Sequence, residues 1–309
     1  MSTVEAIHSA PSACVSNEAQ IAEIRARRRR GMVAVMYCAY GDESRDDTLQ
    51  RVYAVAGVFG HQEDWDAIET PWKTRLNGRV LHAVDCEFGH REFSDLKPGE
   101  GRRIIRDLTT LLAESKLFGY GTAINVAEYK KSFPNDFEDA PYLWGFGDVL
   151  LHVTELTSVA LPREDTTEVI FDRNEPIEYN ANALNEWTRV SKKLGRFLAD
   201  KLSFASRRTV GIQIADLFAR EVMKNLDASL SGSGRLTRSS FRTLHETGRF
   251  RISNLGRDDF ESKKQVLRNS KYRDSANVIA YRKWLDGNRL VDCLTNRIEH
   301  MKALMEPET

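Results

Sequence analysis

Residues 33–43 read VAVMYCAYGDE, a continuous apolar run that ends in two adjacent acids, Asp42 and Glu43. An unbroken apolar run of this length is typical of a strand that is buried on both faces of a sheet. A second such run follows at residues 52–59, after a short polar turn. The spacing predicts an antiparallel hairpin whose first strand ends in carboxylates.

The rest of the chain to residue 228 alternates between strand and helix patterns. Helices are expected over 62–77, 99–116, 142–160, 179–198 and from Gly211 onward, and strands over 117–126, 168–171 and 202–206. This order predicts an α/β fold in which a mixed sheet of three antiparallel and then parallel strands is flanked by helices. Residues 61–116 form an insertion after the second strand, with an irregular stretch at residues 82–93.

The flanking segments differ from this domain in composition. Residues 1–30 are predicted to be a flexible arm, and residues 31–228 form the domain. Residues 229–234 read SLSGSG, a linker that opens a basic and mostly helical extension to residue 309. Residues 235–302 hold 16 Lys and Arg against 8 Asp and Glu. This surplus favours a polyanionic partner, although solvated helix faces explain single charge clusters equally well.

Bulk properties exclude several classes of protein. The 309 residues carry no formal net charge, and no apolar stretch approaches the roughly 20 residues that span a bilayer. No secretory signal is recognised, so we expect a cytoplasmic protein without a membrane partner. The four cysteines lie far apart and form no CxxC pair, which argues against structural zinc and disulfides. No G-x-S-x-G, P-loop or Rossmann glycine motif occurs, which disfavours serine-hydrolase, nucleotide-driven and hydride chemistry.

Two later acids stand where they could meet Asp42. Asp172 ends the strand at residues 168–171, and Asp216 interrupts an otherwise apolar helix. Neighbouring strands lie about 4.8 Å apart, so a helix packed over two strand ends could bring three carboxylates together. Such carboxylates repel one another unless a divalent cation, Mg²⁺ or Mn²⁺, lies between them. Gln213, one turn before Asp216, could hold a ligand carboxylate in place.

Each acid also has an ordinary structural explanation. Asp42 could cap a turn, which the nearby Ser44 would support. Glu43 could face solvent, because side chains alternate across a strand. Asp216 could pair with Arg220 at position i+4 of the same helix.

Three short motifs resemble a known family. The motifs YGDES (40–44), FDR (171–173) and GIQIADL (211–217) are similar to the signatures of domain of unknown function 3800 (DUF3800), which is grouped with the ribonuclease H-like proteins. The strand and helix order also resembles the ribonuclease H arrangement. The resemblance spans residues 33–225, with Arg45 where the family usually has glycine. It implies a ribonuclease H-like fold and a metal site on Asp42, Asp172 and Asp216.

The insertion carries His82, Asp85, Glu87, His90 and Glu92. Their spacing matches no recognised metal motif, and a solvated loop explains it. The family tends to place a histidine or an acid here, so the resemblance implies Asp85 or Glu87 as a fourth carboxylate. Asp148 on the helix at 142–160 is the alternative.

Together these observations predict a metal-dependent phosphodiesterase, a nuclease that acts on nucleic acid through two cations. Its ligands would be the three aspartates, assisted by Glu43 and by Asp85 or Glu87. Gln213, Arg173, His82 and Ser44 would orient ligands or substrate. The alternative is a catalytically silent ribonuclease H-like module that binds a protein or nucleic acid partner. The sequence leaves open the type of nucleic acid, the mode of cleavage and the oligomeric state.

Overall fold

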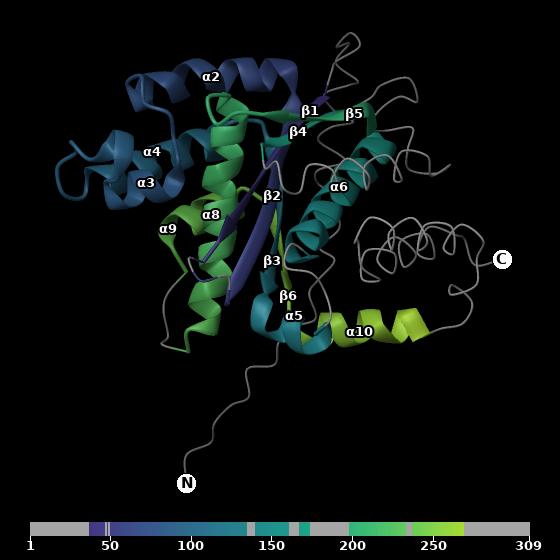
Figure 1. Cartoon of the computed structure of the whole chain (residues 1–309). Coiled ribbons are helices and arrows are strands. Elements are labelled where there is room, and N and C mark those ends of the chain that lie inside the picture. The colour runs from purple at the N-terminus through teal and green to yellow at the C-terminus, as the bar shows by residue number, and fades with distance from the viewer. Residues whose placement is uncertain are drawn as a thin grey trace.

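The computed structural model describes residues 37–268, except for 47, 49, 135–139, 161–166, 174–197 and 233–236. Within these residues six strands form one sheet, in the order β5-β4-β1-β2-β3-β6 (Figure 1). Helices cover both faces of the sheet, so the predicted α/β class is confirmed. The expected arm, the greater part of the helix at 179–198 and the closing helices after residue 268 lie outside the described residues.

The strand directions are those expected from the sequence. β1 (Tyr37–Arg45) pairs with β2 (Val52–His61), and β2 pairs with β3 (Phe118–Asn125), both in antiparallel fashion. β4 (Thr167–Asp172) runs parallel to β1, and β5 (Leu198–Ala205) runs parallel to β4. The mixed sheet of three antiparallel and then parallel strands is therefore confirmed.

Two differences concern the strands themselves. β1 continues past the two acids at which it was expected to end, because Ser44 and Arg45 still pair with β2. Asp42 therefore lies within a strand and not in a turn. The second difference is β6 (Phe250–Leu255), which pairs in parallel with β3 and was not predicted. Its sequence, FRISNL, alternates apolar and polar residues over only four positions, which is a short signal for a strand.

The helices form two layers. The first layer contains α2 (Gln62–Leu76), α3 (Ala83–Phe88), α4 (Glu100–Glu114), α8 (Val210–Leu230) and α9 (Ser239–Glu246). The second contains α5 (Val126–Ser132), α6 (Ala140–Ala160) and α10 (Arg257–Arg268). Figure 1 shows α8 on the left of the sheet and α6 on its right. None of the described helices is both long enough and apolar enough to cross a membrane.

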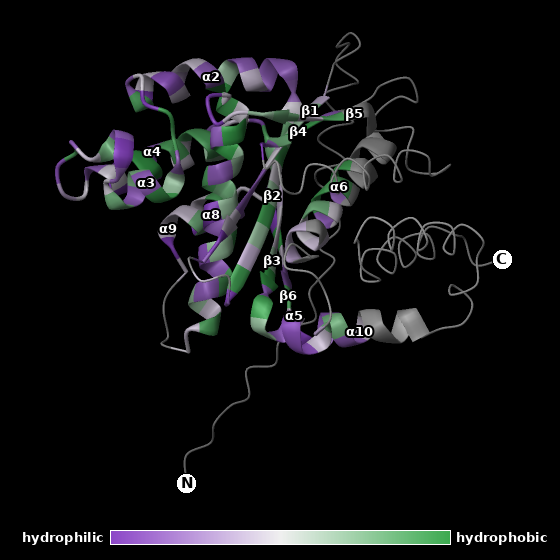
Figure 2. Ribbon diagram, in the orientation of Figure 1, coloured by the Kyte–Doolittle hydropathy of each residue, from purple (hydrophilic) through white to green (hydrophobic). Residues whose placement is uncertain are grey.

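A hydrophobic core lies on each face of the sheet. All ten residues of β2 are buried, and Figure 2 shows the hydrophobic residues along this strand. The core under α8 includes Trp72 and Phe218, and the core under α6 includes Trp144 and Phe171. Helix α8 is buried over most of its length, as its apolar sequence predicts, and it runs through Leu230 into the expected linker.

The insertion is more regular than its sequence indicates. The stretch predicted to be irregular forms helix α3 and a 3-10 turn at Arg91–Phe93. Helix α3 is only six residues long and ends at Gly89, whose φ of 69° is the left-handed conformation that glycine adopts readily. Its backbone packs directly against α4, where a Cβ atom on Gly101 would come within 1.8 Å of the Cys86 carbonyl oxygen.

The contact at Gly101 predicts an unusual response to alanine. Alanine in a helix is normally favoured over glycine by about 1 kcal/mol. At Gly101 the new methyl group would meet backbone and not a flexible side chain, so we expect a net loss of about 1–3 kcal/mol. Urea unfolding measures the change. Gly256→Ala is the control, because a Cβ atom on Gly256 would have no neighbour within 4 Å. Equal effects at both positions would disprove the close contact of α3 and α4.

Candidate functional site

Asp42 and Asp172 lie on the same face of the sheet. Gly41 of β1 stands opposite Phe171 of β4, so the next residue of each strand is one of the two aspartates. A Cβ atom on Gly41 would come within 2.4 Å of the Phe171 ring, which places both of these residues on the α6 side. Because side chains alternate along a strand, Asp42 and Asp172 belong to the α8 side.

Helix α8 brings the third acid to this side. A Cβ atom on Gly211 would come within 2.3 Å of the Tyr40 ring, so the first turn of α8 lies directly on β1. Asp216 follows five residues later and is only 6% exposed. The helix is apolar and buried around Asp216, which therefore faces the protein interior and not solvent. Residues from β1, β4 and α8 thus meet at one end of the sheet.

Asp42 has the most unfavourable environment of the three acids. Burial raises the pKa of its carboxyl group well above the ordinary value. The negative charges of three neighbours raise this pKa further, in the order Glu43, Asp216 and Asp172. One stabilising contact opposes them: Oδ1 accepts a hydrogen bond of 2.7 Å from the backbone N–H of Glu43. Asp42 is therefore close enough to both Asp172 and Asp216 for their charges to act on it.

The fold partly compensates the other two aspartates. Burial raises the pKa of Asp216, and the charge of His82 opposes this shift. The backbone N–H of Ala83 opposes it as well, by donating a hydrogen bond of 2.7 Å to Oδ2 of Asp216. Burial likewise raises the pKa of Asp172, and the Arg207 side chain, with Nε 3.8 Å from Oδ2, opposes it. Arg207 was not predicted as a site residue, although the Arg207-Arg208 pair just before α8 was visible in the sequence.

His82 and Asp85 form a pair at the edge of this acid cluster. The Nδ1 atom of His82 lies 2.8 Å from Oδ2 of Asp85, and Nε of Arg91 lies 3.6 Å from the same oxygen. The charge of His82 also lowers the pKa of both Asp172 and Asp216. His82 therefore lies beside the cluster, and the contact with Asp85 holds its imidazole in place.

The structure gives the other two candidates for a fourth carboxylate different partners. Glu87 accepts hydrogen bonds from Arg220, at 3.1 Å, and from Arg238, at 3.0 Å. Burial raises its pKa, but these two arginines outweigh that effect and lower it. Asp148 lies on the α6 side, where the hydroxyl groups of Tyr120 and Thr122 donate to it. Asp148 therefore belongs to the other face of the sheet, and Arg220 pairs with Glu87 instead of Asp216.

The remaining predicted residues have mainly supporting contacts. Gln213 accepts hydrogen bonds from the Trp72 indole and the Leu81 backbone N–H, both at 3.2 Å, so it attaches the insertion to α8. This differs from its predicted contact with a ligand carboxylate. Ser44 is buried, and the exposed Arg173 continues the chain from Asp172. Glu43 is half-buried on the α6 side. Burial raises the pKa of the nearby Tyr142 hydroxyl group, and the charge of Glu43 raises it further.

The donor set suits a hard divalent cation, because Mg²⁺ and Mn²⁺ prefer carboxylate oxygens. Asp42 and Asp216 each use one oxygen in a backbone hydrogen bond, which leaves the second oxygen of each for an ion. Within the described ranges, however, no three His, Cys, Asp or Glu side chains are arranged to hold an ion directly. Binding would therefore require the aspartate side chains to turn toward one another.

Comparison with known proteins adds no assignment, since neither a family model nor a curated protein matches the chain.

The repulsion at Asp42 predicts a stability change that depends on pH. A carboxyl group whose pKa is raised by folding binds more protons in the folded state, so stability falls as pH rises above its unfolded pKa of about 3.9. With divalent ions removed by EDTA, Asp42→Asn should therefore raise the free energy of unfolding at pH 7 and change it little near pH 4. Urea unfolding at both pH values measures this difference.

Asp46 provides a control of opposite sign. Burial raises its pKa, but the Thr48 hydroxyl and the backbone N–H groups of residues 50–52 outweigh this and lower the pKa to about 2. Its contribution to stability is present above pH 4 and is lost as pH falls toward 2. Asp46→Asn should therefore destabilise the protein at pH 7. If Asp42→Asn destabilises at pH 7 in the same way, the aspartates do not repel one another.

Proposed function

We propose that the protein is a metal-dependent phosphodiesterase that acts on nucleic acid. The observation that carries this proposal is that Asp42, Asp172 and Asp216 lie on one face of the sheet, where the charges of Asp172 and Asp216 raise the pKa of the buried Asp42. A buried group of acids that raises its own pKa is unfavourable for folding alone, and perturbed acids of this kind are common at functional sites. A bound cation would remove the repulsion.

The sheet topology supports this proposal. The strand order β3-β2-β1-β4-β5, with the first three strands antiparallel and the others parallel, agrees with the resemblance to ribonuclease H-like proteins. The acids lie on β1, at the end of β4 and on α8, the helix after β5. β6 is an addition at the far edge of the sheet, away from the acids.

The residues of the site have distinct roles in this proposal. Asp42, Asp172 and Asp216 would hold one or two Mg²⁺ or Mn²⁺ ions, which when bound activate water and neutralise charge on the phosphate. The Ala83 N–H group would fix one oxygen of Asp216, so that its other oxygen faces the site. Asp85 would hold Nδ1 of His82, which leaves Nε2 to donate a proton to the leaving oxygen.

Positive groups around the acids favour a phosphate-containing substrate. Arg207 lies beside Asp172 with its side chain half exposed, and Arg91 lies beside Asp85 with 72% of its side chain exposed. A guanidinium group can bind two phosphate oxygens at once. These arginines would position the phosphodiester next to the aspartates.

A catalytically silent binding module is the alternative, and one observation favours it. His82, Ala83 and Arg207 already compensate part of the charge of Asp172 and Asp216. A site compensated in this way could persist without an ion. Activity and stability that depend on a divalent cation therefore distinguish the phosphodiesterase from the silent binding module.

Metal dependence is the direct test. The purified chain should hydrolyse a phosphodiester with Mn²⁺ or Mg²⁺ and stop when EDTA is added. Asp216→Asn and Asp42→Asn should each lower the rate by about 10²- to 10³-fold or more, because each removes charge from the reacting centre. Mn²⁺ should also stabilise the wild-type chain against unfolding, by about 2.7 kcal/mol at 100 times its dissociation constant.

The matched control for these variants is Asp66→Asn on the exposed side of α2. It removes the same charge and should retain full activity. A wild-type chain that neither hydrolyses phosphodiesters nor gains stability with Mn²⁺ would refute the proposal and leave the silent module.

His82 allows a second test of the site. His82→Ala should lower the rate by about 10²-fold, the usual contribution of general acid catalysis, and should remove one limb of the pH–rate profile. Asp85→Asn should cause a smaller loss, because the imidazole remains but is held less firmly. His90→Ala is the control, since His90 is an exposed histidine of the same insertion. Similar rates for His82→Ala and His90→Ala would rule out proton donation by His82.

A further inference from the structure

The exposed side of α4 is dominated by arginine. Its exposed positions are Arg102, Arg103, Arg106, Thr110 and Glu114. Within the described part of the chain, the guanidinium groups of these three arginines have no ion pair. Two other arginines of the insertion are paired, because Arg75 binds Asp107 and Arg79 binds Asp95, at 2.8 and 2.7 Å. The three arginines on the exposed side of α4, which we name the α4 arginine face, therefore differ from the arginines around them.

This arrangement is unfavourable in the free protein for two reasons. Arg102 and Arg106 are separated by four residues, and Arg103 and Arg106 by three, so the side chains lie next to one another on the helix and repel. Arg102 and Arg103 also lie in the first turn of α4, near the positive end of the helix dipole, where anions and not cations are stabilising. Glu100 and Asp107 lie one turn from Arg103, whereas Arg102 and Arg106 have no acid three or four positions away on the helix. A polyanionic ligand would relieve both effects.

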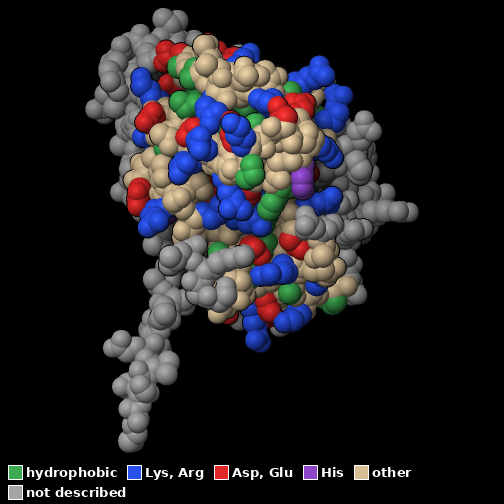
Figure 3. Space-filling model, turned by 90° about the vertical axis from the view of Figure 1, so that its left-hand side faces the viewer, with side chains coloured by type: hydrophobic (Ala, Val, Ile, Leu, Met, Phe, Trp, Pro, Cys, Tyr) green, Lys and Arg blue, Asp and Glu red, His purple; other side chains and the backbone are tan. Residues whose placement is uncertain are grey.

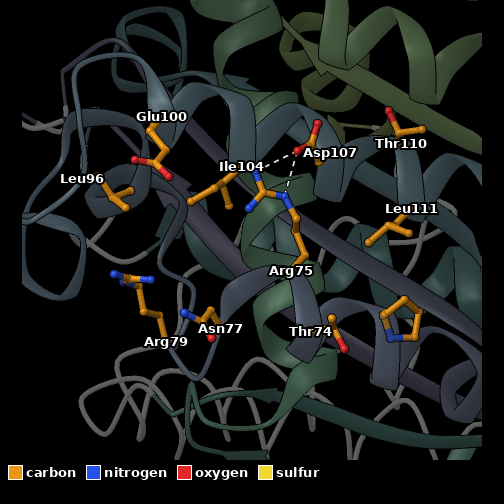
Figure 4. Close-up of a pocket in the computed structure, with 11 residues that line it drawn as sticks. Thr74, Arg75, Asn77, Arg79, Leu96, Glu100, Ile104, Asp107, Thr110 and Leu111 are labelled. Atoms are coloured by element: carbon orange, nitrogen blue, oxygen red, sulfur yellow. Dashed lines mark hydrogen bonds and ion pairs between the residues drawn. The ribbon is translucent and has the colours of Figure 1, made fainter.

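A hollow beside the α4 arginine face offers further hydrogen-bonding groups. It lies between α2 and α4 and has a volume of about 740 Å³. Its lining carries both signs of charge, with Arg75 and Arg79 beside Glu100 and Asp107, and also includes Thr74 and Asn77 (Figure 4). Arg103 lies one turn before Asp107, which lines the hollow, so Arg103 is the member of the arginine face next to it. An extended ligand on α4 would therefore contact hydrogen-bonding groups of both helices.

The α4 arginine face is connected to the acid cluster by α3. Gly101, next to Arg102, packs on the carbonyl group of Cys86 in α3. Ala83, at the start of the same short helix, donates its N–H group to Asp216. Helices α3 and α4 therefore lie in sequence between the acid cluster and the exposed arginines. Figure 3 shows the side of the molecule formed by the insertion, where Lys and Arg side chains gather.

We propose that the α4 arginine face binds the sugar–phosphate backbone of a nucleic acid whose phosphodiester lies at the acid cluster. The choice of nucleic acid rests on the proposed function. Guanidinium groups match phosphate oxygens in geometry and charge, and backbone contacts of this kind fix the position of a polymer without reading its sequence. A membrane surface is a poorer partner, since the exposed positions of α4 include no large apolar residue.

The test compares two triple variants of the full chain. Binding of a fluorescently labelled 20-nucleotide single strand and of a 20-base-pair duplex is measured in EDTA over a range of salt concentrations. For Arg102→Gln/Arg103→Gln/Arg106→Gln, the slope of log K against log salt for the duplex should decrease in magnitude by about 2 to 3, because each lost phosphate contact contributes about 0.9.

The control is Lys130→Gln/Lys131→Gln/Arg257→Gln. These exposed residues lie on α5 and α10 in the second helix layer, and their replacement also removes three positive charges. The slope for this control should equal that of the wild-type chain. Equal losses in both triple variants would overturn the proposal, because net charge alone would then explain them.

Two further outcomes would also overturn the proposal. One is a wild-type chain that binds neither oligonucleotide at low salt. The other is competition by poly-glutamate as strong as competition by unlabelled DNA, which would point to an acidic protein partner. Binding in EDTA does not depend on hydrolysis, so the proposed function can fail separately. A chain that binds through the α4 arginine face but hydrolyses no phosphodiester would refute only the phosphodiesterase.

Discussion

The close approach of α8 to β1 determines the rest of the site. Glycine at position 211 lets the first turn of α8 lie on the Tyr40 ring, closer than any side chain would permit. This contact fixes the height of the helix over the sheet, and the helical repeat then places Asp216 over the end of β1 and β4. A larger residue at 211 would move the helix away and separate the acids. The packing of one glycine therefore controls the electrostatics of three carboxylates.

The insertion belongs to the site and is not a separate addition to the sheet. Gln213 binds the α2 indole of Trp72 and the backbone of Leu81, and so attaches the insertion to α8 just before Asp216. Glu87 attaches the other end of α3 through Arg220 and Arg238. Between these two attachments lie His82 and Ala83, which face the acids. Hydrogen bonds on both sides thus define the position of a helix that is too short to be stable alone.

Much of this arrangement follows from local sequence patterns. The apolar runs predicted β2 and β3 closely, and the otherwise apolar helix after Gly211 singled out Asp216. The parts that sequence reasoning missed depend on partners far along the chain. β6 has only a short apolar alternation of its own, and its pairing with β3, about 130 residues away, makes it a strand. Glu87 resembles a metal ligand until its two arginines, 133 and 151 residues later, are known.

The zero net charge of the chain conceals two opposite and unfavourable charge groups. Asp172 and Asp216 raise the pKa of Asp42 at one end of the sheet, and three arginines without an ion pair lie together on α4. The fold pairs other acids fully with arginines, as at Glu87, but compensates Asp172 only in part through Arg207. Under the two proposals each group serves a ligand. A divalent cation would neutralise the acids and a sugar–phosphate backbone the arginines, so a nucleic acid that reaches from α4 to the acid cluster would contact both.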